Sequence, residues 1–280
     1  MTDSDQYMSV SEFTDMMRGQ VHPVILSSEH IDGYYSHGGI GTAFVLEFCG
    51  ELFVVTALHV LRNQFATHDE LRILLRNAPL SILFDLRAVF RDESDPDPDS
   101  DLVILRIVKS QHAELYAAGL VSLDAAECAF IEDYSRAESF DVFGYPEAGR
   151  SYDYEENILE AQLHWLKGEL IEPAVQGLCT LKIKGHRPGD FNGMSGSLII
   201  ADVDGLMRFA GLVTLASNER GILNFIPAEK IAHHLAEMLR MELAGIVEPE
   251  DSGSVDRAMD GVSGDTRESP RRSLLKPFNN

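Results

Sequence analysis

One serine, one histidine and one aspartate in this chain have the surroundings that nucleophilic catalysis needs. Ser195 stands between two glycines in the run 193–197, His59 follows the apolar run 52–55, and Asp101 opens the apolar run 102–105. A serine is a weak nucleophile at neutral pH until a neighbouring base takes its proton, and histidine is the usual base. A buried carboxylate then holds the imidazole in one tautomer and stabilises its cation. We interpret His59, Asp101 and Ser195 as a candidate catalytic triad.

The order and the spacing of these residues match a known arrangement. Asp101 follows His59 by 42 residues, and Ser195 follows Asp101 by 94 residues. The chymotrypsin-type order His, Asp, Ser has gaps of about 45 and about 93. Over about residues 21 to 235 the chain resembles the trypsin-like, chymotrypsin-fold serine peptidases of bacterial type. Val142–Pro146 carries part of this likeness, because it resembles the strand that opens the second barrel in many bacterial members.

The resemblance implies further site residues. It assigns the oxyanion hole to the backbone N–H groups of Gly193 and Ser195. It places Gly189 at the base of the primary substrate pocket with Asp190 beside it, and His186 within reach of the rim. The wall of the pocket would be formed by Val213, Thr214 and Leu215. A glycine base with an aliphatic wall favours small or apolar side chains, whereas Asp190 pointing inward would favour Lys or Arg.

Two positions depart from the family pattern. Many digestive members carry an aspartate just before the serine, and it pairs with the new N-terminus after zymogen cleavage. This chain has Met194 there, so we do not expect activation by that route. Ser197 stands where a second glycine is usual.

Other patterns have weaker chemical interpretations. Asp99, two residues before Asp101 in an acidic loop, is the second choice for the catalytic aspartate. The loop 92–101 offers oxygen ligands for calcium but lacks the EF-hand glycine and closing glutamate, so a solvated loop is the better interpretation. His233 and His234 are neighbours on a predicted helix and point in different directions. We therefore predict no metal site and no cofactor.

The pattern of short apolar runs predicts an all-β fold. Turn residues separate the runs, which is typical of a barrel or a sandwich. The first set covers 24–26, 42–48, 52–56, 71–75, 81–84 and 102–107. The second set covers 140–143, 157–166, 179–184, 196–201, 207–214 and 221–226. We expect two antiparallel β-barrels of the six-stranded type, as the resemblance implies, followed by a helix over 228–243 whose apolar residues have helical spacing.

These elements divide the chain into four parts. Residues 1–20 form an N-terminal arm with a short helix around 10–18. Residues 21–120 form the first barrel, with His59 and Asp101, and residues 121–245 form the second barrel, with Ser195, and the C-terminal helix. Residues 246–280 have few large apolar residues and are predicted to be a disordered tail.

Composition narrows the partners and the compartment. The chain carries 45 acidic and 23 basic residues, a formal net charge of −22, which disfavours nucleic-acid binding. No run approaches the roughly 20 apolar residues that span a bilayer, so we expect no membrane partner. The start of the chain lacks the features of a signal peptide, and its three cysteines do not resemble a disulfide framework. We expect a cytoplasmic protein.

Two functions from different classes fit these observations. The first is a serine endopeptidase that acts on proteins or peptides through an acyl-enzyme. It would be restrained by a regulatory partner, by an induced fit of the oxyanion loop or by a narrow substrate. The alternative is a catalytically silent trypsin-like fold that serves as a protein-binding or regulatory module. An α/β-hydrolase is disfavoured because its triad order is Ser, Asp, His.

Overall fold

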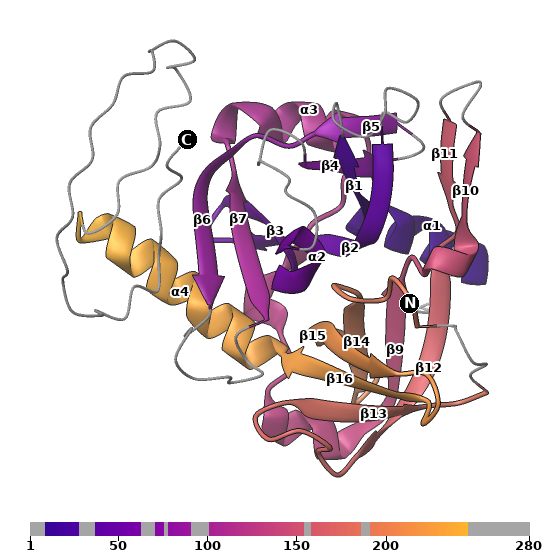
Figure 1. Cartoon of the computed structure of the whole chain (residues 1–280). Coiled ribbons are helices and arrows are strands. Elements are labelled where there is room, and N and C mark those ends of the chain that lie inside the picture. The colour runs from indigo at the N-terminus through magenta and orange to yellow at the C-terminus, as the bar shows by residue number, and fades with distance from the viewer. Residues whose placement is uncertain are drawn as a thin grey trace, which may run out of the picture.

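The computed structural model describes residues 9–27, 37–62, 71–75, 78–90, 101–153, 158–185 and 191–245. The predicted tail, Asp99 and nearly all of the acidic loop lie outside these residues. Two β-sheets dominate the fold, the earlier one above the later one in Figure 1, with a long helix extending to the left. None of the helices within the described ranges has an apolar stretch long enough to cross a bilayer.

The first sheet has eight strands. Its main path runs β5-β4-β1-β2-β3-β7-β6, and β8 pairs in parallel with β2. The strands are β1 Val21–Ser27, β2 His37–Phe48, β3 Glu51–Ala57, β4 Leu71–Leu75, β5 Ala78–Ser81, β6 Phe84–Phe90, β7 Leu102–Ile107 and β8 Leu123–Asp124.

The first sheet is an open half-barrel whose two edge strands follow each other in the chain. Only Ile82 and Leu83 connect the edge strands β5 and β6. Gln111 closes this corner: its amide nitrogen donates to Ser81 O at 2.8 Å, and its amide oxygen accepts from Leu83 N at 3.0 Å. A single glutamine thereby satisfies backbone groups on both sides of the corner.

The second sheet is a closed barrel of six antiparallel strands. Its order is β12-β13-β16-β15-β14-β9. The strands are β9 Ala137–Gly144, β12 His164–Ile171, β13 Cys179–Ile183, β14 Leu198–Val203, β15 Leu206–Ser217 and β16 Ile222–Pro227. A separate hairpin, β10 Arg150–Asp153 with β11 Ile158–Ala161, follows β9.

Helices flank the sheets. The longer ones are α1 Val10–Gln20 and α4 Ala228–Leu243; the short ones are α2 Leu58–Arg62 and α3 His112–Ala117. The 3-10 helices are η3 Lys109–Gln111, η4 Ala125–Glu127, η5 Ile131–Arg136 and η6 Glu147–Gly149. Helix α1 begins with a capping box between Ser9 and Glu12. Its Phe13 packs on Phe143 and Trp165, with ring centroids 5.7 and 5.3 Å away, and so ties the arm to the second barrel.

Two main apolar cores follow from this arrangement. One fills the first sheet and continues under α4, whose residues Ala228, Ile231, Leu235 and Met238 are buried at helical spacing. The other fills the closed barrel. The expected all-β fold with a C-terminal helix is confirmed.

Two of the predicted strands were misplaced. The run 81–84 is the corner between β5 and β6, and the run 157–166 breaks at Gln162 and Leu163 into parts of β11 and β12. Apolar residues continue through both corners, and hydrophobicity alone does not mark a corner that lacks Gly, Pro or Asn.

The nearly buried Arg106 fastens the end of α4 to the first sheet. It lies on β7 and pairs with Asp85 and with Glu242 of α4. We expect Arg106→Met to lower the free energy of unfolding by about 3 kcal/mol, because it removes a nearly buried cation and leaves two partly buried carboxylates uncompensated. Arg136→Met, which breaks surface pairs with Asp133 and Asp204, should cost clearly less, because solvent screens such pairs. Urea unfolding of both variants makes the comparison, and equal losses would contradict it.

Candidate active site

Strand register brings His59 and Asp101 together. Strand β3 pairs antiparallel with β7, so that Ala57 faces Leu102. The residues just beyond this pair, in α2 and before β7, must therefore lie side by side. The N–H of Leu58 donates to Asp101 O at 3.2 Å and extends the ladder by one bond. Two segments that are 42 residues apart in sequence are joined by ordinary sheet pairing.

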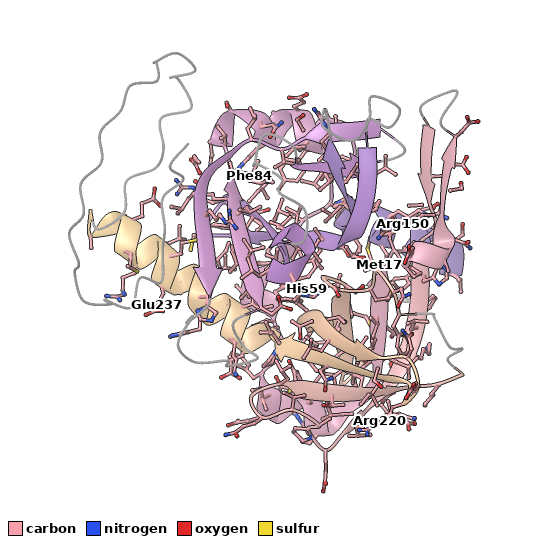
Figure 2. The ribbon with its side chains drawn as sticks, in the orientation of Figure 1. Met17, His59, Phe84, Arg150, Arg220 and Glu237 are labelled. Carbon is pink, nitrogen blue, oxygen red and sulfur yellow. The ribbon has the colours of Figure 1, made fainter. Side chains whose placement is uncertain are left out.

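Asp101 forms two hydrogen bonds with His59. Asp101 Oδ2 lies 2.6 Å from His59 Nδ1, and Asp101 Oδ1 accepts from the His59 backbone N–H at 2.9 Å. The first contact fixes the ring with Nδ1 as the donor and leaves Nε2 as an acceptor. The side chains are 38% and 22% exposed, so the pair is open to a substrate while still partly shielded from water. Figure 2 shows His59 where the two sheets meet.

Ser195 lies on a tight turn before β14. Gly193 and Gly196 have φ of +83° and +85°, a region that residues with a side chain rarely adopt. The turn is closed by Met194 N donating to Phe191 O at 3.1 Å and Ser197 N donating to Met194 O at 3.0 Å. Ser195 Oγ lies 3.5 Å from Thr214 O of β15, a long contact for a hydroxyl.

The serine turn is docked directly on strand β2. Thr42 N donates to Ser195 O at 2.9 Å, and Thr42 Oγ1 donates to Gly193 O at 3.2 Å. A Cβ on Gly196 would lie 1.8 Å from Thr42 O. A Cβ on Gly41 would lie 2.7 Å from a Val60 methyl and 3.2 Å from Ser195 O. Glycine at 41 therefore lets the helix of His59 and the turn of Ser195 approach the same point.

The two departures from the family pattern contact each other. Met194 is fully buried and lies with Phe191 in the core of the closed barrel. Ser197 is also fully buried, and its Oγ lies 3.7 Å from the Met194 sulfur. A Cβ on Gly144 would lie 1.8 Å from Ser197 Oγ, so Ser197 occupies the space that Gly144 leaves open. On this side, the contacts of the turn among the described residues are apolar packing and the Ser197–Met194 contact.

The residues predicted for the substrate pocket have different surroundings. Gly189, Asp190 and His186 lie outside the described residues. Val213 is buried in the barrel core, Thr214 is almost fully buried, and Leu215 is 44% exposed. Of the three predicted wall residues, Leu215 is the one that reaches the surface.

Sequence reasoning did not identify the residues that hold the serine turn. Thr42, Glu147 and Arg150 all contact the turn or the backbone next to it. Thr42 lies in a run that resembles the strand before the histidine hairpin, but nothing marks its hydroxyl as a cross-link. Within the described ranges, no group of three His, Cys, Asp or Glu side chains is placed to hold a metal ion.

Comparison with known proteins agrees with this architecture. No protein-family model matches the sequence, and no curated protein matches it. A thermostable serine protease, AL20, from an extremophilic microorganism superposes with a TM-score of 0.53 at 12% identity, over 79% of this chain and 98% of that one. The atomic-resolution structure of HBP superposes with a TM-score of 0.52 at 12% identity, over 81% of this chain and 93% of that one.

These likenesses define the class of the fold. The chain has the chymotrypsin-like fold, with a closed six-stranded barrel, a half-barrel sheet and a C-terminal helix. Its structural neighbours include a serine protease, which at this identity is a statement about the fold alone.

A substitution at Gly196 has two costs, the steric clash of the new side chain and the strain of its positive φ angle, and Gly205 allows the two to be measured separately. Gly205 also has a positive φ, +80°, but a Cβ there would meet nothing within 4 Å. We expect Gly205→Ala to lower the free energy of unfolding by about 1 kcal/mol, the cost of the left-handed conformation alone. Gly196→Ala should cost at least twice as much, because Thr42 O must also move. Urea unfolding measures both, and equal losses would mean that the turn is not pressed against β2.

Proposed function

We propose that this protein is a serine endopeptidase that hydrolyses peptide bonds through His59, Asp101 and Ser195. The single observation that carries the proposal is the pair of hydrogen bonds between Asp101 and His59. Oδ2 of Asp101 binds the imidazole ring, and Oδ1 binds the backbone N–H. A carboxylate that fixes both the tautomer and the position of an imidazole is the orienting group that a histidine base requires. The docking of the Ser195 turn on β2, beside Val60, supports the same function.

The proposed chemistry begins with proton transfer. Nε2 of His59 takes the proton of Ser195 Oγ while the oxygen attacks the peptide carbonyl carbon, and the carbonyl π electrons move to its oxygen. The N–H groups of Gly193 and Ser195 bind this oxyanion. When the C–N bond breaks, His59 returns its proton to the leaving amine and an acyl-enzyme remains. Water, deprotonated by His59, then attacks the acyl carbon. The ester C–O bond breaks, His59 returns the proton to Ser195 Oγ, and the acid leaves.

The substrate and setting are also part of the proposal. We assign the exposed Leu215 to the wall of the primary pocket, with Val213 and Thr214 supporting it from the barrel. The base of the pocket, which decides between small or apolar residues and Lys or Arg, is assigned to Gly189 and Asp190. Among the described residues, Cys49, Cys128 and Cys179 form no disulfide, which is consistent with a reducing compartment and supports the cytoplasm.

One observation favours the alternative of a silent binding module. Ser195 Oγ is oriented towards Thr214 O, and no hydrogen bond to His59 is among the contacts of the described residues. A serine hydroxyl rotates freely, and catalytic hydrogen bonds often tighten only with substrate bound. We therefore favour the enzyme, and the two functions differ in whether Ser195 can be acylated.

Reaction with a fluorophosphonate probe tests the proposal. We expect the wild-type protein to be labelled on Ser195 and both Ser195→Ala and His59→Ala to be unlabelled, since one removes the nucleophile and the other its base. Asp101→Asn should slow labelling by about three to four orders of magnitude, because the imidazole loses its orienting carboxylate. Rates are read from in-gel fluorescence and the site from mass spectrometry.

Matched variants control for folding. Ser135→Ala and His233→Ala change exposed residues of the same types and should be labelled like wild type. A well-folded wild-type protein that is never labelled, or labelling that survives Ser195→Ala, would contradict the enzyme and favour the binding module.

A further inference from the structure

We propose that Thr42, Glu147 and Arg150 are positioning residues that orient the Asn192–Gly193 peptide, so that the Gly193 N–H faces the reacting carbonyl. This inference rests on the proposed function for its catalytic meaning, but its geometry stands independently. The three residues come from β2, from η6 and from the start of β10. We refer to the segment 145–150 as the strap.

The orientation of the peptide is set by the Asn192 carbonyl. Glu147 N donates to Asn192 O at 2.7 Å. In a planar trans peptide the C=O and N–H groups point in opposite directions, and the described residues contain no cis bond. The Gly193 N–H must therefore point away from Glu147. Among the described residues, neither Gly193 N nor Ser195 N has a hydrogen-bond acceptor, so both are available to an oxyanion.

The hydroxyl oxygen of Thr42, on strand β2 of the first sheet, forms hydrogen bonds with both the strap and the serine turn. Its Oγ1 donates to Gly193 O at 3.2 Å and accepts from Tyr145 N at 2.9 Å. Thr42 is fully buried, so loss of the hydroxyl would leave a donor and an acceptor without partners. The position of the strap relative to the turn thus depends on one hydroxyl group of β2.

Arg150 fixes the other end of the strap. Its Nη2 donates to Gly41 O at 3.0 Å and to Tyr145 O at 2.6 Å, and so joins β2 to the strap a second time. Arg150 is labelled in Figure 2. A Cβ on Gly193 would lie 2.9 Å from Glu147 N and 3.2 Å from Arg150 Nη2. The strap therefore lies so close to Gly193 that a side chain would not fit there. This contact favours glycine at 193 in addition to the positive φ angle.

A backbone substitution at Glu147 tests the orienting bond directly. Glu147→Pro removes the N–H donor, and the site suits proline: residue 147 is the first of η6, and Pro146 is extended with ψ of 156°. Glu147→Ala keeps the N–H and changes only an exposed side chain. In crystal structures we expect the alanine variant to retain the Asn192 O contact and the proline variant to show a rotated Asn192–Gly193 peptide. An unrotated peptide in Glu147→Pro would overturn the inference.

Kinetics gives the second readout. We expect Glu147→Pro to slow fluorophosphonate labelling by about 100-fold and to weaken inhibition by phenylboronic acid in parallel, because both adducts place an oxygen in the hole. Glu147→Ala, which keeps the donating N–H, should be labelled much faster than Glu147→Pro. A proline variant labelled as fast as the alanine variant would overturn the inference. A wild-type protein that is not labelled would overturn the proposed function instead, while the crystal structures still decide the orienting bond.

A second pair of variants, at Thr42, tests the inference if Glu147→Pro does not fold. Thr42→Val removes the hydroxyl at nearly constant shape, and Thr42→Ser restores it. We expect the valine variant to lose about tenfold in labelling rate and in phenylboronic acid affinity, and the serine variant to recover most of both. Thermal unfolding checks that the folds are intact. Equal rates for the valine and serine variants would show that the hydroxyl does not position the turn.

Discussion

The hydrogen bonds between strand β2 and the serine turn are the contact on which the rest of the site depends. Thr42 offers its N–H to Ser195 O and its hydroxyl to Gly193 O, while its own carbonyl accepts from Thr56 Oγ1 at 2.7 Å. The first sheet thus holds a turn that belongs to the second barrel. Such close docking excludes side chains, which explains why Gly41 and Gly196 are glycines on opposite sides of the same contact.

Part of this arrangement is readable from sequence. The apolar runs that end before His59 and begin after Asp101 predict two strands, and their antiparallel pairing brings the histidine and the aspartate together. The turn at Ser195 is marked by its glycines, whose positive φ angles are a local property. These features are set by neighbours in the chain and by one strand pairing, so pattern and spacing are sufficient to find them.

The hydrogen bonds that connect the two sheets cannot be predicted from the sequence in the same way. The bond from Thr42 Oγ1 to Gly193 O spans 151 positions, and the bond from Arg150 to Gly41 O spans 109. A threonine in a strand and an arginine at the start of a short hairpin have many ordinary uses. Only the docking of the two sheets gives these side chains their partners. The corner at Ile82 and Leu83 was missed for a related reason, since Gln111 stabilises it from outside the local sequence.

The turn is stabilised from beneath by apolar packing. Met194 is fully buried in the barrel core beside Phe191, and Ser197 fills the space above Gly144. A buried carboxylate at 194 would need a charged partner to offset its desolvation, whereas methionine needs none and adapts to an irregular gap. The helix α1, anchored through Phe13, covers the neighbouring part of the second barrel by aromatic contacts.

Because the candidate site is divided between two sheets, the order in which the chain is synthesised affects when the site can form. The His59–Asp101 pair is complete within the first sheet, but Ser195 follows 94 residues later on a turn whose shape depends on β2. Because a chain emerges from the ribosome N-terminus first, the segments that form the His59–Asp101 pair are made well before Ser195. Under the proposed function, the complete site would form only after both sheets have folded and docked. The interface between the two sheets would therefore determine when the proposed site is complete.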